Sequence, residues 1–292
     1  MAKSSKIYEL MLKIGAKQDS SLKKACADAD KNLSKLSKSA KAVGKVVAGA
    51  SIAVATTVAT AGVAAVKSGI DYQKQLANVS TLLTGTEAEI SARTAEIGKD
   101  ILKVSNDTGV ETANLTDGMY QVISAFGDSK DAMSILETSA KAAAAGNATT
   151  TDSVNLLSAV MKGYKDVSAE SAQKVADLSF ATVRLGQTSF SELASSIGKV
   201  VPLSSALNVQ QEELYGVFAT LTGVTGSTAE VATQYKAVLS GLMTPSKDMT
   251  ASLKKLGFST ADAAIKSLGF QGTLEALKGT VHGDEQAMAK LF

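Results

Sequence analysis

The sequence is poor in the residues on which most enzymes and secreted domains depend. It has one cysteine, one histidine, two prolines and no tryptophan, and aromatic side chains make up 4% of its 292 residues. A single cysteine, Cys26, excludes an internal disulfide framework and is typical of a reducing compartment. Few prolines and abundant alanine favour helix nearly throughout. With so few bulky aromatics, the core would be thin for an enzyme of this length.

The residues that could carry chemistry do not form a recognisable catalytic pattern. His282 is the only histidine, which excludes a multi-histidine metal site, and its surroundings predict a surface loop over residues 279–283. Cys26 has no histidine near it in the sequence and is expected to pack in a helical core. The carboxylate pairs Glu87/Glu89 and Glu212/Glu213 fall in the first turns of expected helices, where they complement the helix dipole. We therefore predict a protein that is not an enzyme and needs no cofactor or metal.

Charge divides the chain into a basic start and an acidic remainder. Met1–Lys45 has 11 lysines against four acidic residues, a net charge of +7. Since the whole chain carries +2, Val46–Phe292 carries −5. A net charge so close to zero does not indicate a general nucleic-acid-binding surface. Lysines on a helix are usually a solvated face, although this segment could contact DNA or acidic lipid.

The boundary between the two parts is a run of 21 residues without charge, Val46–Val66. As a helix it would span about 30 Å, the thickness of the hydrocarbon core of a bilayer. Three interpretations remain open: a permanent transmembrane helix, a helix buried in a helical assembly, or a helix that is packed in one state and enters a membrane in another. Small residues that would allow close packing of neighbouring backbones are Gly49, Ala53, Gly62 and Ala65. The run contains no leucine and no aromatic residue, which disfavours a permanent transmembrane helix.

A heptad pattern precedes the apolar run. Apolar or small residues recur in alternating steps of four and three, at Leu22, Cys26, Ala29, Leu33, Leu36, Ala40 and Val43. This spacing predicts a coiled-coil seam in the basic segment 1–45, and a seam requires a partner helix from the same chain or from copies of it. Alanine and cysteine at seam positions make the coiled coil weak alone, so we expect it to be ordered mainly within an assembly.

The remainder of the chain predicts an all-α region of short antiparallel helices over 69–292, after the apolar helix at 46–68. A glycine or asparagine, then a serine or threonine, then an acidic residue recur where one helix ends and the next begins. The expected helices are 87–106, 111–126, 129–145, 150–163, 168–184, 189–201, 210–223, 227–243, 247–256, 260–268 and 284–292. The chain stops at Phe292 inside an apolar pattern, so we expect this end to be a cut.

Several stretches of this region resemble the core of phage tail tape measure proteins of the lactococcal-phage type. The stretches are Gly69–Thr81, Gly186–Leu193, Val200–Pro202, Leu207–Leu214 and Gly226–Phe258, and the order and spacing of the motifs carry the resemblance. The positions that match the family pattern include Tyr72, Leu76, Val79, Gly186, Pro202, Gly226, Pro245 and Gly257. Family members are usually much longer, which implies that this chain is a fragment or a truncated prophage copy.

The resemblance implies a structural role in the virion. Such proteins lie in the tail lumen in several copies, set tail length during assembly in the host cytoplasm, and leave ahead of the genome. The implied partners are copies of itself, tail tube and tail tip proteins, tail assembly chaperones and, at ejection, the host membrane. DNA contact would occur only through the tail lumen, without sequence specificity.

Two other classes of function remain as alternatives. A helical pore-forming bacterial toxin would use the apolar run to enter a bilayer, but would need a second long apolar helix, for which Ala140–Ala145 is too short. A cell-wall hydrolase, which is sometimes fused to tape measure proteins, would need a cysteine–histidine or glutamate constellation that the sequence does not provide.

Overall fold

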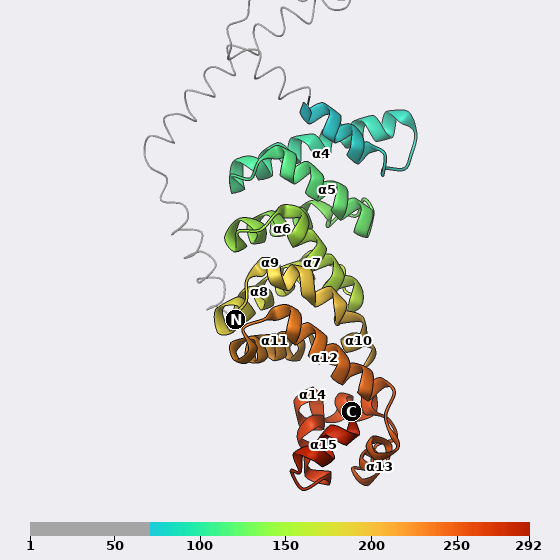
Figure 1. Ribbon diagram of the computed structural model, residues 1–292. Coiled ribbons are helices and arrows are strands. Elements are labelled where there is room, and N and C mark those ends of the chain that lie inside the picture. The colour runs from blue at the N-terminus through green and yellow to red at the C-terminus, as the bar shows by residue number, and fades with distance from the viewer. Residues whose placement is uncertain (1–70) are drawn as a thin grey trace, which may run out of the picture. The chain divides into compact units, whose positions relative to one another are not determined.

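The computed structural model describes residues 71–292, and all regular secondary structure among these residues is helical (Figure 1). The predicted all-α class is confirmed for this part of the chain. A helix over residues 71–80 comes first. It is followed by α4 (Glu87–Thr108), α5 (Thr112–Phe126), α6 (Ala132–Gly146), α7 (Thr150–Gly163), α8 (Ala169–Leu185), α9 (Phe190–Ser196), η1 (Ile197–Lys199), α10 (Val201–Ala206), α11 (Gln211–Thr225), α12 (Thr228–Met243), α13 (Lys247–Lys255), α14 (Ala261–Thr280) and α15 (Glu285–Leu291).

The helices form hairpins that stack on one another in chain order (Figure 1). We call α4, α6, α8 and α11 the A helices, and each packs on the next one. The B helices are α5, α7, the α9–η1–α10 segment and α12, which also pack on one another in turn. Each hairpin consists of an A helix and the B helix that follows it, so the fold between α4 and α12 is an α-solenoid.

Neighbouring A helices run in the same direction. Ser179 of α8 lies 3.1 Å from the hydroxyl of Tyr215 in α11, and Thr182 bonds the carbonyl oxygen of Tyr215 at 3.2 Å. Seven residues beyond Ser179, Gly186 at the end of α8 meets Thr222, which is seven residues beyond Tyr215. Contacts therefore advance together along both helices, as parallel stacking of successive hairpins requires.

Helix starts are fixed by the capping residues that the sequence predicts. The hydroxyl of Thr86 accepts from the backbone N–H of Glu89, whose carboxylate accepts from the backbone N–H of Thr86 at 2.8 Å. Ser189 and Glu192 form the same reciprocal pair at the start of α9. Each pair satisfies two backbone donors that would otherwise lack a partner inside the helix. Both predicted helix starts are confirmed.

Two regions depart from the predicted helix boundaries. The expected helix at 189–201 is divided into α9, η1 and a separate α10, because Pro202 lies in the first turn of α10, where its missing N–H costs nothing. The expected helix at 260–268 is followed directly by a second helical stretch, so that α14 continues to Thr280 beyond a kink at Gly269. Gly269 has a φ of 76°, which glycine adopts without the strain that a side chain would cause. The predicted loop at 279–283 therefore begins only after Thr280.

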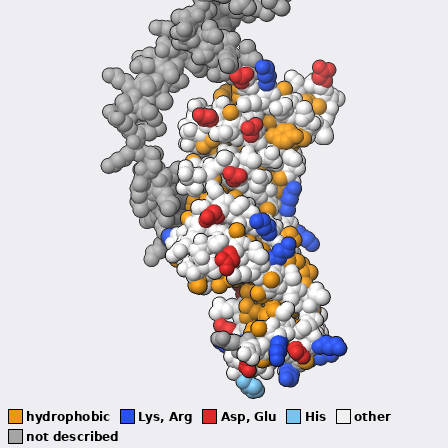
Figure 2. Space-filling model, in the orientation of Figure 1, with side chains coloured by type: hydrophobic (Ala, Val, Ile, Leu, Met, Phe, Trp, Pro, Cys, Tyr) orange, Lys and Arg blue, Asp and Glu red, His pale blue; other side chains and the backbone are white. Residues whose placement is uncertain are grey.

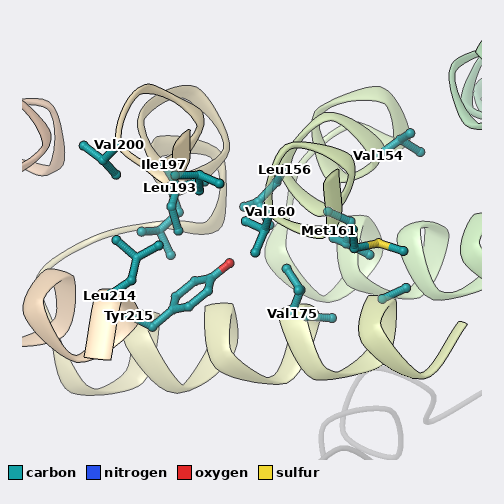
Figure 3. Packing of buried hydrophobic residues seen from close by; sticks show 14 of the residues in the cluster. Val154, Leu156, Val160, Met161, Val175, Leu193, Ile197, Val200, Leu214 and Tyr215 are labelled. Carbon is teal, nitrogen blue, oxygen red and sulfur yellow. The ribbon is translucent and has the colours of Figure 1, made fainter. Parts of the chain in front are cut away.

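The core of the stack lies between the A and B layers. In Figure 3 the ring of Tyr215 extends from α11 toward Val160 of α7, beside Val175 of α8 and Leu193 of α9. All four side chains are buried. Side chains from four consecutive helical segments meet here, so the core is continuous from one hairpin to the next.

Candidate functional site

The predicted coiled-coil seam and the close-packing positions of the apolar run lie outside the described residues. The seam consists of Leu22, Cys26, Ala29, Leu33, Leu36, Ala40 and Val43, and the close-packing positions are Gly49, Ala53, Gly62 and Ala65. Both remain predictions from the sequence. Among residues 71–292, no helix is long and apolar enough to cross a membrane.

The positions that match the tape measure pattern are spread over the solenoid as packing and turn residues. Leu76 and Val79 are buried on the helix over 71–80, and the Tyr72 hydroxyl donates to the carbonyl oxygen of Gly98 in α4 at 2.6 Å. Gly186 and Gly226 cap the C-termini of α8 and α11. The structure does not gather these residues into one site.

The remaining pattern positions also begin or end helices. Pro202 lies in the first turn of α10, Pro245 lies between α12 and α13, and Gly257 follows α13 with a φ of 86°. Proline restrains the backbone at a helix boundary, and glycine accepts the left-handed conformation that ends a helix. These three pattern positions therefore mark helix boundaries in the fold.

A groove with a volume of about 770 Å³ lies between the helix over 71–80 and α4. Leu76, Ala77, Ile90, Ala95 and Leu102 supply much of its apolar wall. Leu102 is 46% exposed, which is high for a leucine within an ordered helix. The charged residues among its lining are Glu87 and Lys99. This composition suits the side of another helix better than a small polar ligand.

A second, more polar groove of about 400 Å³ lies between the helix over 71–80 and α5. Its lining consists of Gln75, Asn78, Thr81, Thr116, Asp117, Tyr120, Gln121 and Thr151. Asp117 supplies the one carboxylate of this lining and Tyr120 its one phenol. No histidine, lysine or second carboxylate lines the groove beside them, which does not suggest a reaction centre.

Two buried tyrosines, Tyr215 and Tyr235, and the half-buried Tyr164 lie close together inside the stack. Burial raises the pKa of Tyr164 and of Tyr215, and raises that of Tyr235 to about 12. Ser179 donates to the Tyr215 hydroxyl, whereas the Tyr164 hydroxyl has no hydrogen-bond partner within the described residues. A pKa so far above neutrality keeps these side chains protonated, so they act here as core residues rather than as bases.

The two predicted carboxylate pairs do lie in first helical turns, but the dipole explanation for Glu212 and Glu213 is incomplete. Glu212 pairs with Lys174 of α8 at 2.8 Å, and this bond lowers the pKa of the Glu212 carboxyl. Glu213 reaches in the other direction and accepts the backbone N–H of Phe270 at 2.7 Å. These two neighbours thus connect α11 to α8 and to α14.

Other predicted chemical residues stand alone in the described part of the chain. His282 is exposed in the turn after α14, with a φ of 53°, as the surface interpretation predicts. No group of three or more histidine, cysteine or acidic residues within 71–292 is arranged to hold a metal ion. On the face drawn in Figure 2, acidic and basic side chains are interspersed without a large patch of one sign.

Sequence reasoning missed the solenoid, although a signal for it is present. Glycines lie at the ends of the A helices at Gly109, Gly146, Gly186 and Gly226, in steps of 37, 40 and 40 residues. A fixed period of this length is typical of helical-hairpin repeats. Each helix-ending motif alone predicts one helix boundary, whereas the common spacing of all four predicts a repeat.

Comparison with known families assigns the fold to a group of tail proteins. The family of phage-related minor tail proteins matches residues 98–292, which is most of the chain and nearly all of the stack. No curated protein and no solved structure gives a significant match. The chain therefore belongs to the family of phage-related minor tail proteins, which are components of the virion tail.

Proposed function

We propose that this chain is the core region of a tape measure protein, a structural, non-enzymatic component that controls tail length during assembly and assists genome ejection. The proposal is supported by the positions, within the fold, of the residues that match the tape measure pattern. Tyr72 bonds one helix to the next, Gly186 ends a helix, and Pro202 lies in the first turn of another. All three belong to one continuous stack. Membership of the minor tail family adds support from an independent comparison.

Within this role, the solenoid is suited to assembly rather than to measuring. Forty residues in one straight helix would span about 60 Å, whereas one layer of packed helices advances only about 10 Å. A ruler made of hairpins would therefore need several times more protein for the same tail. We infer that the stack is a folded assembly domain, that residues outside it measure, and that tube proteins, tip proteins, chaperones and other copies are its partners.

Deleting the region from the phage genome tests the proposal. An in-frame deletion of residues 71–292 should leave heads filled with DNA but abolish tails of defined length, giving either no tails or tubes of widely scattered length. Electron microscopy of lysates measures this distribution, and wild-type protein supplied in trans should restore it. Tails of normal number and length would overturn the proposal.

The same experiment separates length control from a role in ejection alone. Tails of normal length on non-infectious particles would keep the chain in the tail but remove its measuring role. For the pore-forming alternative, purified full-length chain would release a dye from lipid vesicles without any other phage protein. The proposal expects no such release in the absence of an assembled tail.

A further inference from the structure

The last three helices of the chain, α13, α14 and α15, do not continue the regular stack of hairpins. The glycine spacing itself continues, because Gly269 follows Gly226 by 43 residues, close to the earlier steps of 37 and 40. In the regular stack, the glycine at the end of an A helix lies against the last turn of the neighbouring A helix, as Gly186 does at Thr222. Gly269 lies instead at the first turn of α11, where an added Cβ would be 2.8 Å from the Glu213 carboxylate. This last group of helices is therefore placed differently from the hairpins before it.

α14 covers the end of the stack and buries an aromatic cluster there. It packs on both helices of the last hairpin, α11 and α12, beyond which it lies in Figure 1. The ring centroid of Phe270 is 5.4 Å from that of Tyr235 in α12, which is 6.4 Å from that of Phe218 in α11, and both pairs are edge to face. All three side chains are at most 4% exposed. Removing α14 would expose the Tyr235 ring and the side of the last hairpin around it.

α13 and α15 are attached to α14 and to the stack at a second place. α13 packs on both α14 and α15. The hydroxyl of Ser246, at the start of α13, donates to the carbonyl oxygen of Leu291 at 3.0 Å. Phe292 lies against Gly241 of α12, where an added Cβ would be 3.0 Å from the Phe292 Cδ1. The three helices thus form one group, held on α11 and α12 by α14 and by Phe292.

We propose that α13, α14 and α15 form a cap that keeps a second copy of the chain from associating with the last hairpin. A solenoid buries each repeat against the next, so its terminal repeat needs a cover to remain soluble. Without the cap, α11 and α12 would present an aromatic surface, and large exposed surfaces of this kind drive association. The partner is the same surface of a second uncapped copy, because identical surfaces related by a two-fold axis can bury each other. The proposal does not depend on the tape measure role, so either can fail without the other.

Substitutions on α14 test the cap in the full-length chain. Phe270→Asp places a carboxylate against Tyr235 and close to Glu213, which should expel α14. Leu268→Asp is the matched control, since Leu268 lies on the same helix but is 44% exposed. Light scattering measures the mass of each protein over a range of concentrations. The mass of Phe270→Asp should rise toward about twice that of the wild type, whereas Leu268→Asp should keep the wild-type mass. Association through the predicted seam is common to all three proteins and cancels in this comparison.

Glu213→Ala addresses the case in which Phe270→Asp does not fold. It removes the acceptor of the Phe270 N–H bond and leaves the aromatic contacts in place. The cap should then open less often, so association is expected only at higher protein concentration than for Phe270→Asp. Hydrogen exchange of residues 261–292 measures the opening. Wild-type mass at every concentration while these residues exchange faster would overturn the proposal, and so would exchange that stays at the wild-type rate.

A disulfide between α12 and the end of α15 tests which surface associates. The Cβ position of Gly241 lies 3.6 Å from the Phe292 Cβ, within the range that a disulfide spans. Gly241→Cys and Phe292→Cys are combined with Cys26→Ser and Glu213→Ala. Oxidation should fix the cap on α12 and return the mass to the wild-type value, and dithiothreitol should restore association. Association that persists in the oxidised protein would show that another surface is used and would contradict the proposal.

Discussion

Glu213 and Phe270 are joined by a hydrogen bond that spans 57 residues of sequence. The carboxylate of Glu213, in the first turn of α11, accepts the backbone N–H of Phe270 at 2.7 Å, immediately after the kink at Gly269. The bond supplies an acceptor to a backbone donor at the start of the second half of α14, as an N-cap side chain normally does. It therefore attaches the last helices of the chain to the solenoid.

Removing this carboxylate should loosen the C-terminal helices. Glu213→Ala is expected to lower the free energy of unfolding by about 1.5–3 kcal/mol, the usual range for a hydrogen bond to a charged group that is partly buried. Urea denaturation measures the change. Glu212→Ala is the matched control, because its partner Lys174 is solvent-exposed and such pairs contribute little. Equal losses in the two variants would contradict the assigned role of Glu213.

Two glycines inside helices should respond to alanine in opposite directions. At Gly118 of α5 an added Cβ would lie 2.6 Å from Thr150 Cγ2 and 3.0 Å from Leu136 Cδ1. Gly118→Ala is therefore expected to cost about 1–3 kcal/mol through overpacking. At Gly216 of α11 nothing lies within 4 Å, so Gly216→Ala should stabilise the protein by about 0.5–1 kcal/mol. Thermal unfolding measures both, and a stabilising Gly118→Ala would show that α5 and α7 are less tightly packed.

Phenylalanine substitutions compare the contribution of the Tyr215 hydroxyl to stability with that of the Tyr164 hydroxyl. Tyr215→Phe removes the acceptor of a bond from Ser179 and should cost about 0.5–1.5 kcal/mol. Tyr164→Phe removes a buried hydroxyl without a partner in the described residues and should be neutral or stabilising. Denaturation at neutral pH compares the two. A larger loss for Tyr164→Phe would reveal a partner for its hydroxyl.

Alkaline pH should weaken the fold through Tyr235. Burial raises the pKa of Tyr235 from 10.0 to about 12, so the unfolded chain loses this proton at lower pH than the folded protein does. The stabilising contribution is complete below pH 10 and is lost as the pH rises toward 12, by up to about 3 kcal/mol for two pKa units. Unfolding free energies at pH 8 and pH 11 should therefore differ less in Tyr235→Phe than in the wild type. An identical pH dependence would show that Tyr235 ionises freely in the folded state.

The sequence predicts the local structure of this protein better than its arrangement. Caps such as Thr86 with Glu89 are visible because both partners lie within one helical turn. Single-sequence rules treat proline and glycine as helix breakers, so they predict that a helix ends at Pro202 and another at Gly269. In the folded protein a new helix begins at each, supported by neighbours distant in sequence, such as Glu213 for the helix after Gly269.

The candidate groove likewise depends on how the helices are arranged and not on local sequence. The groove between the helix over 71–80 and α4 is lined by Leu76 and Leu102, which come from these two different helices. Their proximity depends on a turn between those helices and on the Tyr72 hydroxyl bond to Gly98. Neither feature has a signature in the order of residues alone, so the groove could be found only once the helices were placed.

The stacking of each hairpin on its immediate neighbours has a consequence for biosynthesis. Because α6 depends on α4, α5, α7 and α8, and not on the far end of the chain, its native contacts are complete once the next hairpin has left the ribosome. Folding can then proceed from the first hairpin to the last at the pace of translation. Nascent chains would expose only the newest hairpin at any moment, which limits the apolar surface open to aggregation.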